Sequence, residues 1–281
     1  MINYNFHQHS NFSDGTSPLE DYVQKALDLG FIAIGFSEHS PLPFETKFSL
    51  KQEKISDYIK ETDALKNKYK NQIKLYRSLE MDYIPVFSNN FRKWKNKVQA
   101  DYLIGSVHLV KPDNSDSLWF IDGPNKEIYD IGLREFFNGD IKNAVKTYYY
   151  QVNDMVETQQ FDIVGHIDKI KMHNKNRFFH ETERWYKELA METLFLIKEK
   201  DLIVELNTRG LYKKRSNSFF PDDFILYQLK EMNIPIIISS DAHKPEELNL
   251  FFDEATKRLK DIGIKYVVFF NGKNWLEKGL D

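Results

Sequence analysis

The 281-residue sequence contains no cysteine, which excludes a disulfide scaffold, a thiol nucleophile and any zinc or iron–sulfur site held by cysteine. It also lacks an excess of charge, because 39 Lys and Arg against 42 Asp and Glu give a formal net charge of −3. A balanced chain of this kind has no electrostatic footprint for nucleic acid or for an anionic membrane surface. Any bound metal ion must therefore be held by His, Asp and Glu.

Long hydrophobic runs are absent as well. The longest apolar stretches, such as 234–238, have the length of a strand, whereas a membrane span needs about 18 or more apolar residues. The N-terminus shows no basic region followed by an apolar stretch, so a secretory signal is not expected. No linker rich in Gly, Ser or Pro interrupts the chain. We therefore expect a cytoplasmic protein in which residues 1–281 form a single domain.

Strand-like and helix-like segments alternate along the chain, as the apolar runs and the amphipathic stretches indicate. The expected strands are 2–6, 31–36, 73–79, 102–107, 161–164, 202–206, 234–239 and 266–270. The expected helices are one between an N-cap at Ser17 and Gly30, then 51–70, 140–159, 181–200, 222–232 and 246–262. Two long loops, 37–50 and 110–131, follow strands and are expected to shape a pocket. This order predicts a parallel α/β barrel, with a doubly wound open sheet as the alternative, since alternation alone does not show closure.

Six of the eight histidines lie at or just beyond the C-terminal end of an expected strand: His7, His9, His39, His108, His166 and His243. These strand ends form one face of a parallel α/β fold, the face where ligands bind. Three carboxylates accompany the histidines, namely Asp14, Glu80 and Asp241. A single histidine at a strand end is more often a hydrogen-bonded core or surface residue than a metal ligand. The whole set, however, predicts a site for Zn, Mn or Fe.

The same residues resemble the polymerase-and-histidinol-phosphatase (PHP) family. The matching motifs, in the family's order, are Phe6-His7-Gln8-His9-Ser10, Ser13-Asp14-Gly15, Ser37-Glu38-His39-Ser40, Leu79-Glu80-Met81-Asp82-Tyr83, Gly105-Ser106-Val107-His108, Gly165-His166-Ile167-Asp168 and Ser239-Ser240-Asp241-Ala242-His243. The segments 38–43 and 205–211 are similar to the monofunctional histidinol-phosphate phosphatase branch. The resemblance implies a distorted (β/α)7-type barrel, with two or three divalent metal ions at the C-terminal ends of the strands.

The resemblance also implies which residues hold each ion. By position, the first ion would be held by His7, His9, Glu80 and Asp241. The second would be held by Glu80, His108 and His166, with Glu80 bridging the two. The third would be held by Asp14, His39 and His243, although many relatives carry His at the position of Asp14.

These ions would create a positive pocket that attracts a phosphate monoester dianion, a small-molecule substrate. A hydroxide that bridges two ions, held by Glu80, would attack phosphorus in line. The candidate acids for the leaving group are a metal-bound water and, if it is free of metal, His243. No phosphoenzyme is expected, because cysteine is absent and the carboxylates are needed as ligands. The resemblance implies that the substrate is L-histidinol phosphate, hydrolysed to L-histidinol and phosphate in histidine biosynthesis.

Three basic residues, Arg177, Arg209 and Lys213, follow strands on the same face and are predicted to hold phosphate oxygens. The alternative for each is plain solvated surface. In the loop after His39, a further hypothesis is that Phe44 and Glu45 meet the amine and imidazole of the leaving group, although packing or solvent exposure is the commoner role for such residues.

The two remaining histidines, His173 and His180, are assigned to structure because neither follows a strand. Two other functions stay open at this stage. One is a phosphoesterase acting on nucleotides or oligonucleotides with the same metal core, and the other is a catalytically silent metal-binding module. The aromatic run 148–150 suggests a platform for single-stranded nucleic acid, but such platforms need a basic groove that the charge balance does not provide.

Overall fold

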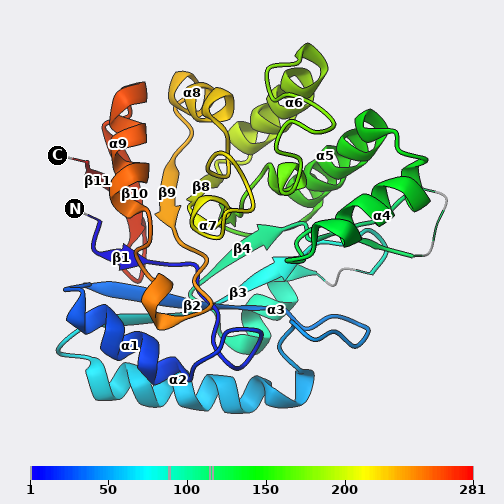
Figure 1. Ribbon diagram of the computed structural model, residues 1–281. Helices are drawn as coiled ribbons and strands as arrows, with labels where there is room; N and C mark the ends of the chain where they lie inside the picture. Colours follow the sequence, from blue (N-terminus) through cyan, green and yellow to red (C-terminus); the bar gives the residue numbers. More distant parts are fainter. Residues whose placement is uncertain (1, 88–89, 114, 116, 281) are drawn as a thin grey trace.

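A computed structural model describes residues 2–87, 90–113, 115 and 117–280. Its centre is a nearly closed barrel of seven parallel strands (Figure 1). Neighbouring strands follow the order β1 (Tyr4–Asn5), β2 (Ala33–His39), β3 (Lys74–Asp82), β4 (Tyr102–Ser106), β7 (Ile163–Val164), β8 (Ile203–Asn207) and β9 (Ile236–Ser239). Every strand pairs in parallel with its neighbour. The predicted barrel architecture is confirmed.

The two edge strands, β9 and β1, meet at a seam that the backbone bridges just beyond the strand ends. Gln8 and Ala242 form a parallel bridge there, and the amide of His9 donates to the carbonyl of Ala242 at 2.8 Å. Lower in the seam, the side chain of Asn5 donates to Ser240 Oγ at 2.9 Å. These contacts join the sheet edges, so the open-sheet alternative is wrong.

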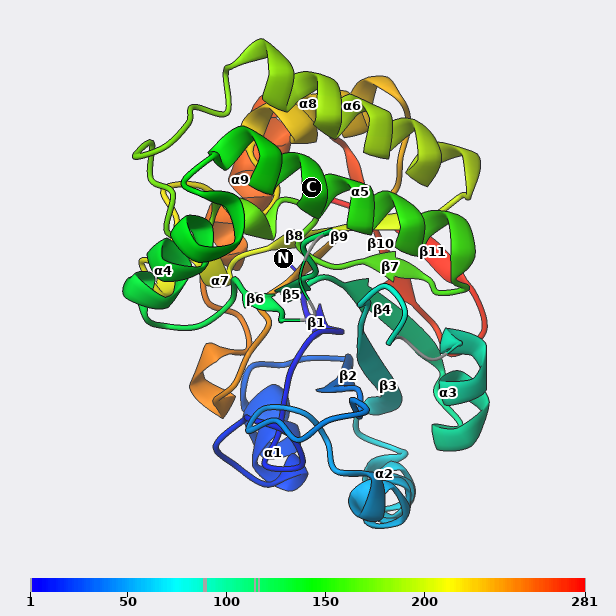
Figure 2. The same ribbon diagram turned by 90° about the vertical axis from the view of Figure 1, so that its right-hand side faces the viewer.

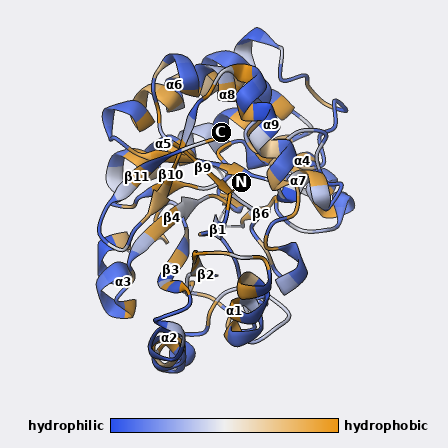
Figure 3. Ribbon diagram, turned by 90° about the vertical axis from the view of Figure 1, so that its left-hand side faces the viewer, coloured by the Kyte–Doolittle hydropathy of each residue, from blue (hydrophilic) through white to orange (hydrophobic). Residues whose placement is uncertain are grey.

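Helices surround the barrel on its outside (Figures 1 and 2). The α-helices described are α1 (Leu19–Asp28), α2 (Ile55–Tyr69), α3 (Phe91–Val98), α4 (Lys126–Phe137), α5 (Ile141–Thr158), α6 (Arg184–Glu199), α7 (Arg209–Tyr212), α8 (Asp223–Glu231) and α9 (Phe252–Ile262). Three 3-10 turns accompany them, η1 (Gln52–Lys54), η2 (Lys169–Lys171) and η3 (Pro245–Glu247). The helices carry both hydrophilic and hydrophobic residues (Figure 3), as expected when one face packs on the barrel and the other meets solvent.

The last two strands, β10 (Tyr266–Phe270) and β11 (Trp275–Gly279), form an antiparallel hairpin outside the barrel sheet. The predicted strand 266–270 therefore exists, but it is not a barrel strand. The Phe270 ring lies 5.0 Å from the rings of Tyr76 and Trp275 and 5.9 Å from that of Tyr102. Tyr102 begins β4, so this aromatic cluster covers the N-terminal ends of the strands, opposite the predicted metal site.

Several helix boundaries differ from the prediction. Ser17 is not the N-cap of α1, because its carbonyl accepts from the amide of Asn11 and the helix begins after Pro18. Helix α9 begins at Phe252 instead of 246, since the segment before it forms the turn η3. Among the residues described here, no helix has the length and apolar character required to cross a membrane.

The predicted loop 110–131 contains more structure than expected, although residues 114 and 116 lie outside the described part. Strands β5 (Leu109–Val110) and β6 (Trp119–Phe120) form a short hairpin, and α4 begins at Lys126. The sequence did not predict helix α3 either. Only Phe91, Trp94 and Val98 of this helix are buried, which gives a weak apolar pattern.

Candidate metal centre

All nine predicted ligand residues lie together at the C-terminal end of the barrel. The strands themselves carry two of them, because β2 ends at His39 and β3 continues to Asp82 and so includes Glu80. The other seven, His7, His9, Asp14, His108, His166, Asp241 and His243, lie on the segments that follow β1, β4, β7 and β9. Parallel pairing places these segments side by side, which is why residues far apart in the sequence meet here.

The Glu80 carboxylate lies at the middle of this cluster. Its Oε2 atom is 3.3 Å from His7 Nε2, 3.4 Å from His9 Nε2 and 3.1 Å from His39 Nδ1. Its Oε1 atom is 2.9 Å from His166 Nε2 and 3.4 Å from His108 Nε2. One buried carboxylate thus contacts five imidazoles.

Two further carboxylates lie beside the rim of the cluster. Asp241 Oδ1 is 3.4 Å from His9 Nε2 and 3.5 Å from His243 Nδ1. Asp14 Oδ1 is 3.2 Å from His243 Nε2 and 3.6 Å from His39 Nε2. Four sets of ligand atoms lie close enough together to hold a cation: His9, Asp14, His39 and His243; His7, Glu80 and His166; His7, His9 and Asp241; and His39, Glu80 and His108.

The donor atoms of the cluster fit divalent cations. Four buried atoms that face one another have no hydrogen-bond partner among the described residues: His7 Nε2, His9 Nε2, His39 Nδ1 and Glu80 Oε2. An unsatisfied buried polar atom costs about 1–3 kcal/mol, so a folded protein rarely gathers several without a ligand. Imidazole nitrogen and carboxylate oxygen together suit Zn, Mn or Fe.

The electrostatics of the cluster set the protonation states of its ligands. Burial, together with the neighbouring His39 and His243, lowers the pKa of His9 to about 3, so its ring is neutral. Although burial alone would raise the pKa of Glu80, the rings of His7, His108 and His39 hold that pKa well below its ordinary value. His9 and Glu80 are therefore in the forms that bind metal ions. Burial alone would lower the pKa of His7 and of His108, but the charges of Glu205 and Asp82 respectively raise both well above the ordinary value, so these two rings must release a proton when they bind an ion.

Two buried carboxylates, Glu205 and Asp82, accept hydrogen bonds from the Nδ1 atoms of His7 and His108 and so orient these rings. Glu205 Oε1 accepts from His7 Nδ1 at 2.5 Å, and its Oε2 accepts from the amide of His166 at 2.8 Å. Asp82 Oδ1 accepts from His108 Nδ1 at 2.6 Å. With a metal ion bound, such bonds would fix the tautomer so that Nε2 of His7 and of His108 faces the ion as a ligand. Sequence reasoning gave no role to Glu205 or Asp82, although a carboxylate inside an otherwise apolar strand was an available signal.

A third buried carboxylate, Glu38, holds the loop that carries Asp14. It accepts from the amide of Ser10 at 3.0 Å, from Ser10 Oγ at 2.6 Å and from the hydroxyl of Ser13. Burial raises the pKa of Glu38 to about 7, and the serine hydrogen bonds oppose this rise. The loop also needs Gly15, since a Cβ there would lie 2.0 Å from the His9 carbonyl oxygen.

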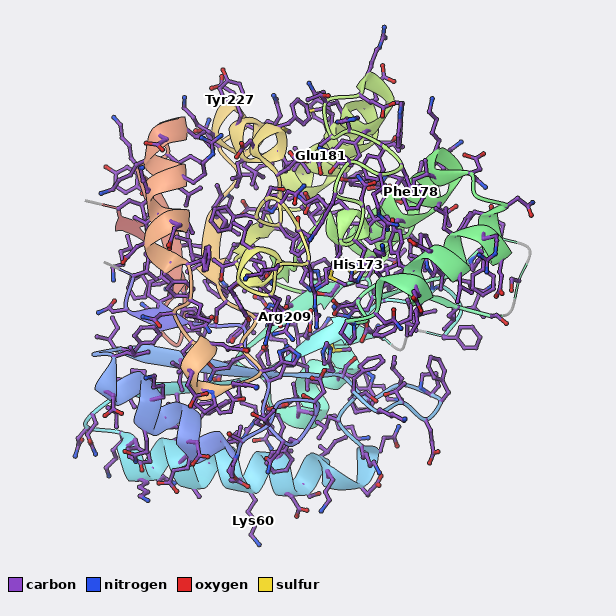
Figure 4. The ribbon with its side chains drawn as sticks, viewed as in Figure 1. Lys60, His173, Phe178, Glu181, Arg209 and Tyr227 are labelled. Atoms are coloured by element: carbon purple, nitrogen blue, oxygen red, sulfur yellow. The ribbon has the colours of Figure 1, made fainter. Side chains whose placement is uncertain are left out.

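Of the three predicted phosphate-binding residues, Arg209 and Lys213 lie beside the cluster. Arg209 Nη1 donates to the carbonyl of Asp241 at 2.7 Å, and Figure 4 shows Arg209 near the middle of the molecule. Lys213 forms an ion pair with Glu247, which also accepts from the amide of His243 at 3.0 Å. In their described contacts, both side chains therefore support the segment that carries Asp241 and His243.

Arg177 has different neighbours. Its guanidinium donates to both carboxylate oxygens of Asp130 at 2.8 Å and to the carbonyl of His173. No cluster residue is among its partners in the described structure. His173 itself has a structural contact, as its Nε2 donates to the carbonyl of Gly123 at 2.8 Å.

The other predicted residues outside the cluster, Phe44, Glu45 and His180, are exposed. The ring of Phe44 lies 6.2 Å from that of Phe87. The amide of His180 donates to the carboxylate of Glu183 at 2.9 Å.

Sequence reasoning missed two residues beside the cluster, Asp122 and Lys169. Asp122 Oδ2 is 3.6 Å from His108 Nε2, and its Oδ1 is 2.8 Å from Lys169 Nζ. Burial alone would raise the pKa of Asp122, but the charges of Lys169 and His108 bring it to about 2. Asp122 follows the short strand β6 within what was predicted to be a loop, where no periodic pattern marks its position.

Comparison with known proteins adds the following. The family model for the PHP domain matches residues 5–209. The histidinol-phosphatase of Bacillus subtilis (strain 168) is 27% identical over 254 residues, which cover 85% of this chain and 92% of that protein.

Two solved structures share the fold. The hisK protein of Listeria monocytogenes matches with a TM-score of 0.81 and 24% identity, covering 89% of this chain and 99% of that one. The histidinol phosphate phosphatase of Lactococcus lactis, complexed with Zn, L-histidinol and phosphate, matches with a TM-score of 0.67 and 23% identity, covering 97% and 98%.

Proposed function

The chain belongs to the PHP domain family, and on that premise we propose that it is a metal-dependent phosphomonoesterase that hydrolyses L-histidinol phosphate to L-histidinol and inorganic phosphate. The observation that supports the reaction type is the Glu80 carboxylate in contact with five imidazoles, several of whose inward atoms have no hydrogen-bond partner among the described residues. The leaving group is suggested by the relatives from Bacillus subtilis and Lactococcus lactis.

We propose that the nine clustered residues hold two or three divalent cations, Zn, Mn or Fe. His7, His9, Glu80 and Asp241 would hold the first. Glu80, His108 and His166 would hold the second, and Asp14, His39 and His243 the third. When bound, such cations supply positive charge for phosphoryl oxygens and lower the pKa of water, which provides a nucleophile near neutral pH.

The chain's own residues then prepare the site for in-line displacement. Glu80 keeps five imidazoles from four strand ends in one place, and Glu205 and Asp82 fix the orientation of the rings they contact. With the third site empty, His243, which lies at the rim with some exposure to solvent, fits a group that donates a proton to the departing alkoxide. Because every carboxylate in the cluster is committed to the histidines, we propose direct transfer to water without a phosphoenzyme.

Aromatic side chains near the cluster fit an imidazole-bearing leaving group. The Phe48 ring lies 5.2 Å from that of His39, edge to face, and stacks on Phe120 at 5.5 Å. Both phenylalanines are partly exposed, so their remaining surface is available to a planar ring. A small-molecule monoester is therefore the proposed partner, in place of nucleic acid or a membrane, and residues 1–281 are proposed to act as one domain.

A substrate panel with metal-loaded protein tests the assignment. We expect kcat/KM for histidinol phosphate to exceed that for nucleoside monophosphates and for a nitrophenyl diester by orders of magnitude. A flat profile would contradict the assignment and favour a broader phosphoesterase. Glu80→Gln should abolish turnover and lower metal content, whereas Glu192→Gln, an exposed change on α6, should alter neither.

A further inference from the structure

Asp14 is the most exposed of the nine clustered residues. Its side chain is 31% exposed, whereas the side chains of the other eight are 13% exposed or less. Its Oδ1 atom nevertheless lies 3.2 Å from His243 Nε2 and 3.6 Å from His39 Nε2. Tight packing does not hold a side chain at this exposure, so the position of Asp14 depends on the loop that carries it.

This loop, residues 10–15, closes around Ser10. The Ser10 carbonyl accepts from the amide of Ser13 at 3.1 Å and from the amide of Gly15 at 2.9 Å. The residues on either side of Asp14 are therefore both bonded to Ser10. The backbone at Asp14 can be no better fixed than Ser10 itself.

Glu38 fixes Ser10 and Ser13 together. Its two carboxylate oxygens accept from the Ser10 amide at 3.0 and 3.1 Å, and Oε1 also accepts from the Ser10 hydroxyl at 2.6 Å. Oε2 accepts from the hydroxyl of Ser13, the residue before Asp14. Glu38 is fully buried, and hydrogen bonds to a buried carboxylate are charge-assisted and strong. One side chain thus holds both ends of the turn that presents Asp14.

The strand β2 ends with Glu38 followed by His39. Adjacent residues of a strand point to opposite faces, so His39 reaches the cluster while Glu38 reaches loop 10–15. Among the described residues, Glu38 forms its hydrogen bonds with this loop and with none of the nine clustered residues. The end of β2 therefore supplies one ligand of the proposed third ion directly and supports a second.

We propose that Glu38 is a positioning residue that sets the affinity of the third site, acting through Ser13 to keep Asp14 within reach of the ion that His39 and His243 also hold. The inference rests on the proposed function, because it concerns the third of the proposed ions. The first and second sites take no ligand from residues 10–15. Loosening the loop should therefore release the third ion alone.

The zinc-to-protein ratio, measured at a series of buffered free zinc concentrations, tests this assignment without turnover. The wild type should bind three ions. Ser13→Ala removes one hydrogen bond to Glu38, and we expect the affinity for the third ion to fall by about 10- to 100-fold while the other two bind as in the wild type. Ser49→Ala is the matched control, because Ser49 is also half-buried and its hydroxyl bonds to Thr46 Oγ1 at 2.6 Å, away from the cluster. It should keep all three ions.

Two variants of Glu38 separate its hydrogen bonds from its packing. Glu38→Met fills a similar volume without an acceptor, so it should lose the third ion at least as readily as Ser13→Ala. Glu38→Gln keeps an oxygen for Ser10, and its NH2 group can donate to the Ser13 hydroxyl, which accepts as well as donates. It should therefore bind the third ion almost as the wild type does. Urea unfolding in a chelator shows that each variant is folded. If Glu38→Gln loses the third ion as fully as Glu38→Met, the hydrogen-bonding role is wrong.

Three other results would overturn the proposal. They are a Ser13→Ala protein with wild-type affinity for the third ion, an equal loss of affinity for all the ions, and a wild type that binds only two ions at saturating zinc. If the wild type hydrolyses histidinol phosphate and any of these is found, only this inference fails. If the third ion is lost selectively but the wild type does not hydrolyse histidinol phosphate, the proposed substrate is wrong and this inference stands.

Discussion

Glu205→Gln should weaken both the fold and the metal centre, although it replaces one side chain by another of the same shape. The carboxylate is buried and accepts four hydrogen bonds. Oε1 accepts from His7 Nδ1 and from the hydroxyl of Ser239. Oε2 accepts from the amide of His166 and from Asn207 Nδ2, at 2.8 and 3.1 Å. All four partners are donors, so a glutamine can satisfy only the pair that its oxygen faces.

The expected loss of stability follows from these four hydrogen bonds. Whichever way the amide turns, its NH2 group meets two buried donors that lose their acceptor. At about 1–3 kcal/mol for each unsatisfied group, the free energy of unfolding should fall by about 2–6 kcal/mol. A domain of ordinary stability has only about 5–15 kcal/mol. The His7 ring also loses its orienting anion, so metal affinity should fall by about 10- to 100-fold.

Urea unfolding in the presence of a chelator measures the first effect, and titration of zinc against a competing chelator measures the second. Glu192→Gln is the control, because Glu192 is exposed on α6 and surface substitutions change stability by about 0.5 kcal/mol or less. If Glu205→Gln matches this control in both measurements, the positioning role assigned to Glu205 is wrong.

Three further predictions concern other parts of the molecule. Asp14→Asn should lower the metal content by one ion and keep the others, because among the described residues Asp14 contacts only His39 and His243 in the cluster; an unchanged metal-to-protein ratio would contradict this. Burial keeps the pKa of His173 below its ordinary value, so the unfolded chain takes up the proton first and stability should fall as the pH drops below about 6.5. His173→Asn should make the urea midpoint less dependent on pH between 7 and 5, and an unaltered slope would refute the reasoning. Phe270→Ala should cost about 3–5 kcal/mol of unfolding free energy with zinc affinity unchanged, since its ring packs at the opposite end of the barrel; a loss of zinc affinity would show that the two ends are coupled.

The convergence of the nine residues was predictable because it depends on topology alone. Once parallel strands are inferred from buried apolar runs, their C-terminal ends must meet, and residues such as His39 and Glu80 at those ends must approach each other. Their role as metal ligands stays a prediction until ions are bound and counted.

The supporting residues were harder to foresee. Glu205 and Asp82 look like ordinary strand residues, and only the depth of their burial shows that they need partners. Asp122 and Lys169 depend on how irregular segments fold back on the cluster, which periodicity does not encode. Periodicity also does not show that β10 and β11 form a separate hairpin, because the sequence of β10 predicts one more strand of the barrel.

The seam between β1 and β9 gives the cluster a mechanical role. His7 and His9 extend from one edge of the sheet and Asp241 and His243 from the other, and hydrogen bonds such as that from the His9 amide to the Ala242 carbonyl join the two edges. A cation held by residues from both edges, as proposed for the first site, would link the two edge strands. Because the proposed first site takes ligands from His7 and His9 at one edge and from Asp241 at the other, we expect that ion to bind fully only once the two edges have met.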